Sequence, residues 1–153
     1  MNIPLINISS LYSDDESEKL KVAKAIDTAC RESGFFYIQG HPISRERLQE
    51  MHDLSRAFFA LPEAEKIKID IALSANHRGY GKMKAEQLDP ERPGDIKETF
   101  DMGLNLPSDH PLIGANRPLY GPNQYPQRPV GFQQKQERHY QDMLERGKNV
   151  ISP

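Results

Sequence analysis

The chain has little of several residue types that mark whole classes of protein. Its 153 residues include one cysteine and no tryptophan, which excludes an internal disulfide framework and a cysteine-based zinc site. No window approaches the 18 or so consecutive apolar residues of a membrane-spanning helix. The amino terminus lacks the basic stretch and apolar run of a signal peptide. We therefore expect a cytoplasmic protein without a membrane partner.

An excess of charge of one sign is also absent. The chain carries 20 basic and 22 acidic residues, for a net charge of −2, so we expect no basic surface of the kind that binds nucleic acid. Hydrophobic residues make up only 37% of the chain, which predicts a thin core for a single domain of this length.

Patterns in the first part of the chain predict a strand, a helix and a second strand. Residues 3–8 alternate apolar positions, and the run from Ser13 to Glu16 has the spacing of a capping box that begins a helix. Gly34 ends this helix, and the aromatic run 35–38 predicts a buried strand. Cys30 lies on the apolar face of the helix and is expected to be a small buried residue.

The rest of the chain predicts one more helix, then loops and short strands, and a final helix. Ser44 begins a helix that ends at Leu61-Pro62, and residues 99–103 form a strand. Six prolines between residues 104 and 131 exclude a long helix there, whereas residues 132–151 are helical with one apolar stripe. The fold class expected is α+β, with helices packed on a few short strands.

Most catalytic motifs are missing. None of the five histidines is followed two residues later by Asp or Glu, so the chain has no His-x-Asp metal chelate. The segment His77-Arg78-Gly79-Tyr80 places a cation and a phenol on a turn, which either grips a carboxylate or simply makes a turn with a half-buried tyrosine. An enzyme built on His77, Glu98 and His139 is the weakest hypothesis, because these residues share no recognisable catalytic spacing.

An ordered set of short motifs resembles a known family. The motifs are Ile3-Pro4-Leu5-Ile6-Asn7, Gly34-Phe35-Phe36-Tyr37-Ile38 with Gly40-His41, Phe58-Phe59 before Leu61-Pro62, Arg78-Gly79-Tyr80, Lys97-Glu98-Thr99-Phe100-Asp101-Met102-Gly103, and Gly121-Pro122-Asn123-Gln124-Tyr125-Pro126. In this order and spacing the chain is similar to the amino-terminal half of the non-haem iron(II), 2-oxoglutarate-dependent oxygenases of the isopenicillin N synthase type. The resemblance covers residues 3 to about 151.

The resemblance implies a fold that this chain contains only in part. In the family a jelly roll (double-stranded β-helix) holds iron through a His-x-Asp pair and a distant His, and a downstream Arg-x-Ser binds 2-oxoglutarate. All of these lie carboxy-terminal to the matched region. The resemblance thus implies an amino-terminal dioxygenase domain at 1–128, and at 129–153 the start of the helix that leads into the absent catalytic jelly roll. No catalytic or metal-binding residue is expected in this chain.

The resemblance also implies four candidate substrate-binding residues. Arg78, Tyr80, Glu86 and Glu98 match the region that forms part of the wall of the substrate pocket, and they are expected to shape it or to contact substrate. The turn at 121–126 is expected to be structural, with its Asn and Gln satisfying backbone groups of loops.

Two readings of function remain. The chain is expected to be the substrate-pocket-forming portion of an iron(II)/2-oxoglutarate-dependent oxygenase, inactive as truncated, with a small-molecule substrate and the missing carboxy-terminal jelly-roll half as partners. The alternative is a stand-alone, non-catalytic interaction module derived from that family.

Overall fold

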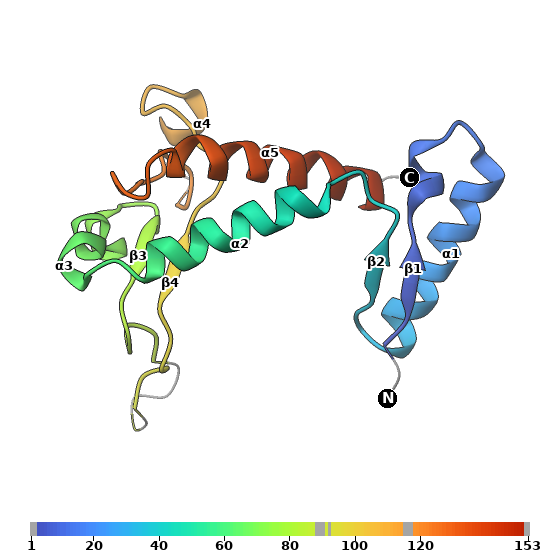
Figure 1. Ribbon diagram of the computed structural model, residues 1–153. Helices are drawn as coiled ribbons and strands as arrows, with labels where there is room; N and C mark the ends of the chain where they lie inside the picture. The colour runs from blue at the N-terminus through green and yellow to red at the C-terminus, as the bar shows by residue number, and fades with distance from the viewer. Residues whose placement is uncertain (1–2, 88–90, 92, 115–117, 152–153) are drawn as a thin grey trace. The chain divides into compact units, whose positions relative to one another are not determined.

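The computed structural model describes residues 3–87, 91, 93–114 and 118–151 (Figure 1). The chain has an α+β fold of two compact units. One unit contains residues 1–48 and 141–153, and the other contains residues 49–140. The expected division at residues 128 and 129 stays a prediction. Part of the loop at 82–95, namely residues 88–90 and 92, lies outside the described residues.

The first unit is built on two short parallel strands joined through a helix. Strand β1 (Leu5–Asn7) pairs with β2 (Tyr37–Gln39), and the 3₁₀ helix η1 (Ser9–Tyr12) and helix α1 (Glu16–Glu32) lie between them in sequence. The core of this unit contains Ile6, Ile8, Leu11, Val22 and Ala29, with Val150 of helix α5 (Phe132–Ile151) packed against it. A parallel pair requires a crossover, and α1 supplies it (Figure 1).

The cap of α1 differs from the expected capping box. Asp15, which has an extended backbone, accepts hydrogen bonds from the amides of Ser17 and Glu18. The Ser13 hydroxyl instead accepts from the amide of Asp15, because Ser13 lies two residues before the capping position. At the other end the prediction is confirmed: Gly34 has φ +78° and its amide donates to the Ala29 carbonyl at 3.0 Å.

Two predictions of burial in this unit are wrong. The aromatic run is mostly exposed: the strand β2 begins only at Tyr37, and Phe35 and Tyr37 are 54% and 61% accessible, whereas Phe36 is partly buried against the core of this unit. Cys30 is exposed as well. It follows the buried Ala29 by one residue, about 100° around the helix, which turns it away from the core.

The second unit has an aromatic core between helices and a strand pair. Helix α2 (Arg45–Phe59) begins after Ser44, as predicted, and the Ser44 hydroxyl accepts from the amide of Arg47. Its residues Met51, Leu54 and Phe58 are buried. The ring of Phe58 packs at 5.1 to 5.4 Å from those of Phe132 and Phe100.

The apolar stripe of the last helix is confirmed only in part, at Phe132 and at Val150, which packs against the core of the first unit. Phe132 at the beginning of α5 is 2% exposed, whereas Met143 is 46% and Ile151 83% exposed. Leu48 of α2 is also 42% exposed. The apolar residues therefore outnumber the positions that this chain itself can cover.

Two short strands form the ribbon that matters for the site. Strand β3 (Gly79–Gly81) pairs antiparallel with β4 (Thr99–Asp101), and Tyr80 lies opposite Phe100. The segment predicted as a turn is thus a strand, because its partner pairs with it along all three residues. The remaining short elements are α3 (Glu63–Lys66), η2 (Ile67–Ile69), η3 (Ile71–Leu73) and α4 (Pro111–Gly114).

Side-chain amides hold the proline-rich segment in place. The Gln124 amide group donates to the carbonyls of Asp70 and Arg78, and Asn123 bonds the backbone of Gly103. Since a backbone without regular structure leaves polar groups unpaired, these side chains replace the partners that a helix or sheet would supply. The structural role predicted for the 121–126 turn is confirmed.

Candidate functional site

The β3–β4 ribbon separates the aromatic core from a cavity. Side chains alternate across a strand, so Tyr80 and Phe100 face the core while Gly81, Thr99 and Asp101 line the other side. The cavity has a volume of about 620 Å³. It is lined by Ile71, Ala72, Ser74, His77, Gly81, Lys82, Ala85, Glu86, Lys97, Thr99 and Asp101.

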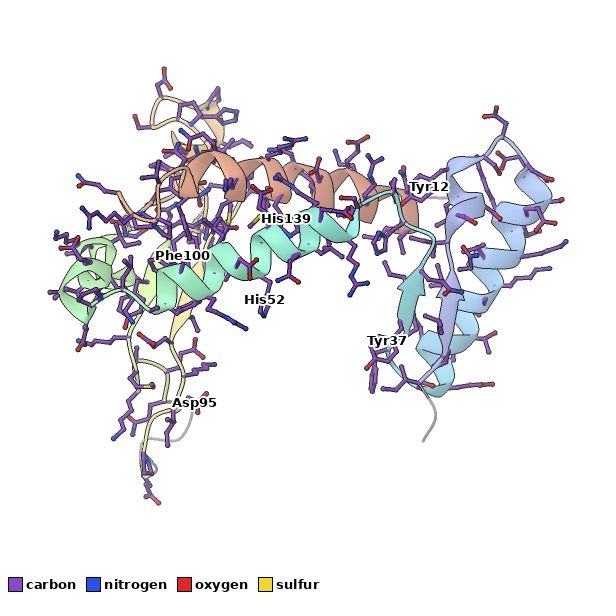
Figure 2. The ribbon with its side chains drawn as sticks, in the orientation of Figure 1. Tyr12, Tyr37, His52, Asp95, Phe100 and His139 are labelled. Carbon is purple, nitrogen blue, oxygen red and sulfur yellow. The ribbon has the colours of Figure 1, made fainter. Side chains whose placement is uncertain are left out.

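Glu86 is the predicted site residue that lines this cavity. Its carboxylate pairs with Lys97 at 2.5 Å, and Asp95 lies 3.3 Å from the same ammonium group. Hydrogen bonds with Glu86 first, and then with Asp95, raise the pKa of Lys97. Backbone bonds between Lys84 and Asp95 and between Asp95 and Glu86 hold the two sides of the loop together. Figure 2 shows Asp95 on this loop, beyond the end of the ribbon.

Tyr80 and Glu98 lie on the core side of the ribbon and not among the cavity-lining residues. Tyr80 is 1% exposed, and its hydroxyl donates to the Glu98 carboxylate. The same carboxylate oxygen accepts from the buried ammonium of Lys66. The bond from Lys66, followed by that from Tyr80, lowers the pKa of Glu98. Burial, followed by the bond to Glu98, raises the pKa of Tyr80.

Arg78 makes contacts within the protein. Its guanidinium donates to the carbonyls of Asn76 at 3.0 Å, His77 at 3.1 Å and Leu119 at 2.6 Å. A side chain at Gly103 would clash with this guanidinium, so the glycine makes room for it. Arg78 therefore joins the turn before β3 to the proline-rich segment. A role in substrate contact stays a prediction for it, as for Tyr80 and Glu98.

Sequence reasoning missed most of the polar residues of the cavity. Lys97, Thr99 and Asp101 lie in the segment 97–103 that the sequence singles out. The residue predicted to belong to the site, however, is Glu98, which lies between Lys97 and Thr99. The signal that could have found them is the alternation of the strand, because a core position for Phe100 places 99 and 101 on the opposite face. Lys82 carried no comparable signal.

His77, Glu98 and His139 lie in three different parts of the structure. His77 lines the cavity, with a left-handed backbone at φ +53°, whereas Glu98 joins the buried network on the core side. His139 lies along α5, where Figure 2 labels it. These positions give no support to a catalytic group made of the three.

The described part of the chain has neither a metal-binding group nor a membrane-spanning helix. There, no group of three His, Cys, Asp or Glu side chains is arranged to hold a metal ion, so those residues do not fit an iron centre. Over the same residues, no helix combines the length and the apolar character needed to cross a bilayer.

Residues 3–128 match the family described as "non-haem dioxygenase in morphine synthesis N-terminal". The chain therefore belongs to this family, the amino-terminal region of the 2-oxoglutarate- and iron(II)-dependent oxygenases. The expected family is confirmed.

Curated relatives and solved structures agree. The chain is 32% identical, over 97% of its length, to 44% of the 2-oxoglutarate-Fe(II) type oxidoreductase hxnY of Emericella nidulans. It is 36% identical, over 85% of its length, to 41% of the homoarginine-6-hydroxylase 2-ODD-233 of Oryza sativa. The crystal structure of a full-length Neurospora crassa protein in complex with alpha-KG aligns with a TM-score of 0.75 and 27% identity, over 97% of this chain and 44% of that one. The chain thus spans less than half the length of these relatives, and the α+β fold matches their amino-terminal part.

Proposed function

We propose that this chain is the substrate-pocket-forming, amino-terminal portion of an iron(II)/2-oxoglutarate-dependent oxygenase. The observation that carries the proposal is the family match over residues 3–128, in a chain that covers 44% of an oxidoreductase of this type. The division of labour follows from chemistry. An iron centre needs converging His and carboxylate ligands, and the described residues do not fit one. We assign the residues for iron and 2-oxoglutarate to the carboxy-terminal portion of such an enzyme.

The cavity supports a role in holding a small-molecule substrate. It combines apolar surface from Ile71 and Ala85 with polar groups from Glu86, Lys97 and Thr99, the mixture that small-molecule sites use for burial and orientation. We propose that Glu86 contacts substrate directly. Arg78, Tyr80 and Glu98 would shape the pocket from behind, because their polar groups are engaged within the protein.

The proposal is tested by supplying the portion that this chain would need. Residues 3–151 are joined to the carboxy-terminal portion of the Emericella nidulans relative, and succinate is measured with iron(II), 2-oxoglutarate and ascorbate under air. We expect the chimera to form succinate, and the present chain alone to form none above the buffer control. Sustained succinate from the chain alone would overturn the division of labour.

Substrate choice is tested on the same chimera with a matched pair of variants. Glu86→Gln removes the charge of the cavity-lining carboxylate, and Glu91→Gln makes the same change at an exposed residue of the same loop. The first substrates to test are homoarginine and thymine. Homoarginine appears in the name of the Oryza sativa relative, and thymine is bound in a structure of the Neurospora crassa protein. If Glu86 contacts substrate, its variant raises KM for the accepted reactant and the Glu91 variant does not. Equal KM values in all three proteins would contradict the contact.

The alternative of a stand-alone interaction module predicts the reverse behaviour. Such a module would cover its own apolar surface or bind a partner through it, and the chimera would stay without iron- and 2-oxoglutarate-dependent turnover. The cytoplasmic location expected from the sequence stays a prediction.

A further inference from the structure

A buried polar network lies directly behind the wall of the cavity. Lys66 is 5% exposed, and its ammonium donates to the Phe59 carbonyl at 3.1 Å and to Glu98. The Tyr80 hydroxyl donates to the same Glu98 oxygen, and the ammonium lies 5.2 Å from the centroid of the Tyr80 ring. One carboxylate oxygen thus receives two donors from different elements.

The network joins four elements at one point. Phe59 is the last residue of α2, Lys66 is the last residue of α3, Tyr80 is the centre of β3, and Glu98 immediately precedes β4. The ribbon has only three residues in each strand, which is too few for its own hydrogen bonds to define its position. The ring of Phe100 packs against that of Phe58 in α2, and the polar network adds directional bonds between the ribbon and the helices α2 and α3.

A buried charged pair is better suited to fixing the relative position of two elements than to raising the free energy of unfolding. Removing two charges from water is costly, and apolar replacements of similar size are often as stable as a buried ion pair. Directional bonds to a charged oxygen, by contrast, allow few alternative arrangements of the groups that make them. The residues on either side of Glu98, namely Lys97 and Thr99, both line the cavity.

We propose that Lys66 is a positioning residue, which through Glu98 and Tyr80 fixes the β3–β4 ribbon and thereby the wall that Gly81, Lys97 and Thr99 present to the cavity. This inference rests on the proposed function, since that function makes the cavity the substrate site. The contacts described for the Lys66 ammonium are with Phe59, Glu98 and Tyr80, none of which lines the cavity, so Lys66 acts on the cavity through Glu98.

The test separates position from stability by neutralising the pair. Lys66→Met alone leaves a carboxylate without its cation, so the deciding variant is the double substitution Lys66→Met with Glu98→Gln, in which Tyr80 keeps an acceptor. The control is Lys68→Met, which removes an exposed lysine of η2 that pairs with Glu65 of α3. Urea unfolding gives global stability, and hydrogen exchange of the protected amides in 79–81 and 99–101 gives local opening, with the amides of α2 as reference.

We expect the double variant to unfold at the same urea concentration as the unsubstituted chain while its ribbon amides exchange about tenfold faster, the loss expected from one charge-assisted hydrogen bond. The control should change neither quantity. Ribbon amides that exchange as slowly as before would overturn the proposal. Faster exchange shared equally by the α2 amides would overturn it too, because the pair would then serve stability alone. The measurement needs no substrate, so its failure is distinct from failure of the proposed function.

Discussion

Asn123 pairs with Gly103 as a neighbouring strand would. Its Oδ1 accepts from the Gly103 amide at 3.0 Å and its Nδ2 donates to the Gly103 carbonyl at 2.8 Å. One side chain thus satisfies both backbone groups of a residue 20 positions away in sequence. It holds the end of β4 to the proline-rich segment.

Replacing Asn123 should therefore destabilise the second unit. Asn123→Ala leaves two backbone groups of Gly103 without partners, which should lower the free energy of unfolding by about 1–3 kcal/mol. The measurement is urea unfolding followed by far-UV circular dichroism. Gln127→Ala, at an exposed neighbouring residue, is the control and should change little. Equal losses in both variants would contradict the role of the paired bonds.

Two glycines should respond to alanine in opposite directions. A Cβ at Gly103 would clash with the Arg78 guanidinium, so Gly103→Ala must displace a side chain that binds three carbonyls and should destabilise. Gly147 lies inside α5 with nothing within 4 Å of such an atom. Gly147→Ala should stabilise by about 1 kcal/mol, because alanine restricts the unfolded chain and favours helix. The sign of each change in urea midpoint is the test.

Acid should weaken the network behind the cavity. Lys66, then Tyr80, lowers the pKa of Glu98 below its usual 4.5, so the folded state favours the ionised carboxylate. The resulting stability is fully present above pH 4.5 and is lost as the pH falls through the lowered value. Glu98→Gln should flatten the dependence of unfolding free energy on pH below 4.5. Glu65→Gln, at an exposed carboxylate, should flatten it less, and the opposite ranking would contradict the network.

The exposed aromatic strand should make this chain bind a hydrophobic dye. Phe35 and Tyr37 are 54% and 61% accessible, and Leu5, opposite Tyr37, is 59% accessible. Phe35→Ser combined with Tyr37→Ser should reduce dye fluorescence and self-association in sedimentation, because it removes apolar surface from solvent contact. Val130→Ser, at an isolated residue that is 88% accessible, is the control. A monomer that ignores the dye before any substitution would favour an independent module.

The sequence alone determined the elements whose signals are local. Ser44 and Gly34 placed the start of α2 and the end of α1 correctly, since capping depends on residues within a few positions, whereas α2 ends at Phe59, before the predicted Leu61-Pro62. The ordered motifs likewise indicated the family. The residues that follow each of the five histidines showed that the His-x-Asp pattern of its metal ligands is absent from this sequence. The sequence also predicted that Asn123 and Gln124 satisfy backbone groups of loops, and their hydrogen bonds to Gly103 and Arg78 confirm it.

Only the tertiary structure decided which polar residues face the cavity. Glu98 and Thr99 are adjacent in sequence, so strand alternation by itself places them on opposite sides. The packing of the ribbon decides which side is which: Glu98 meets Lys66 and Thr99 lines the cavity. The sequence allows Arg78 to bind either a carboxylate or backbone carbonyls. In the fold its guanidinium donates to the carbonyl of Leu119, 41 residues away. Local sequence determines which groups can bond, whereas the approach of distant segments decides which partner each one meets.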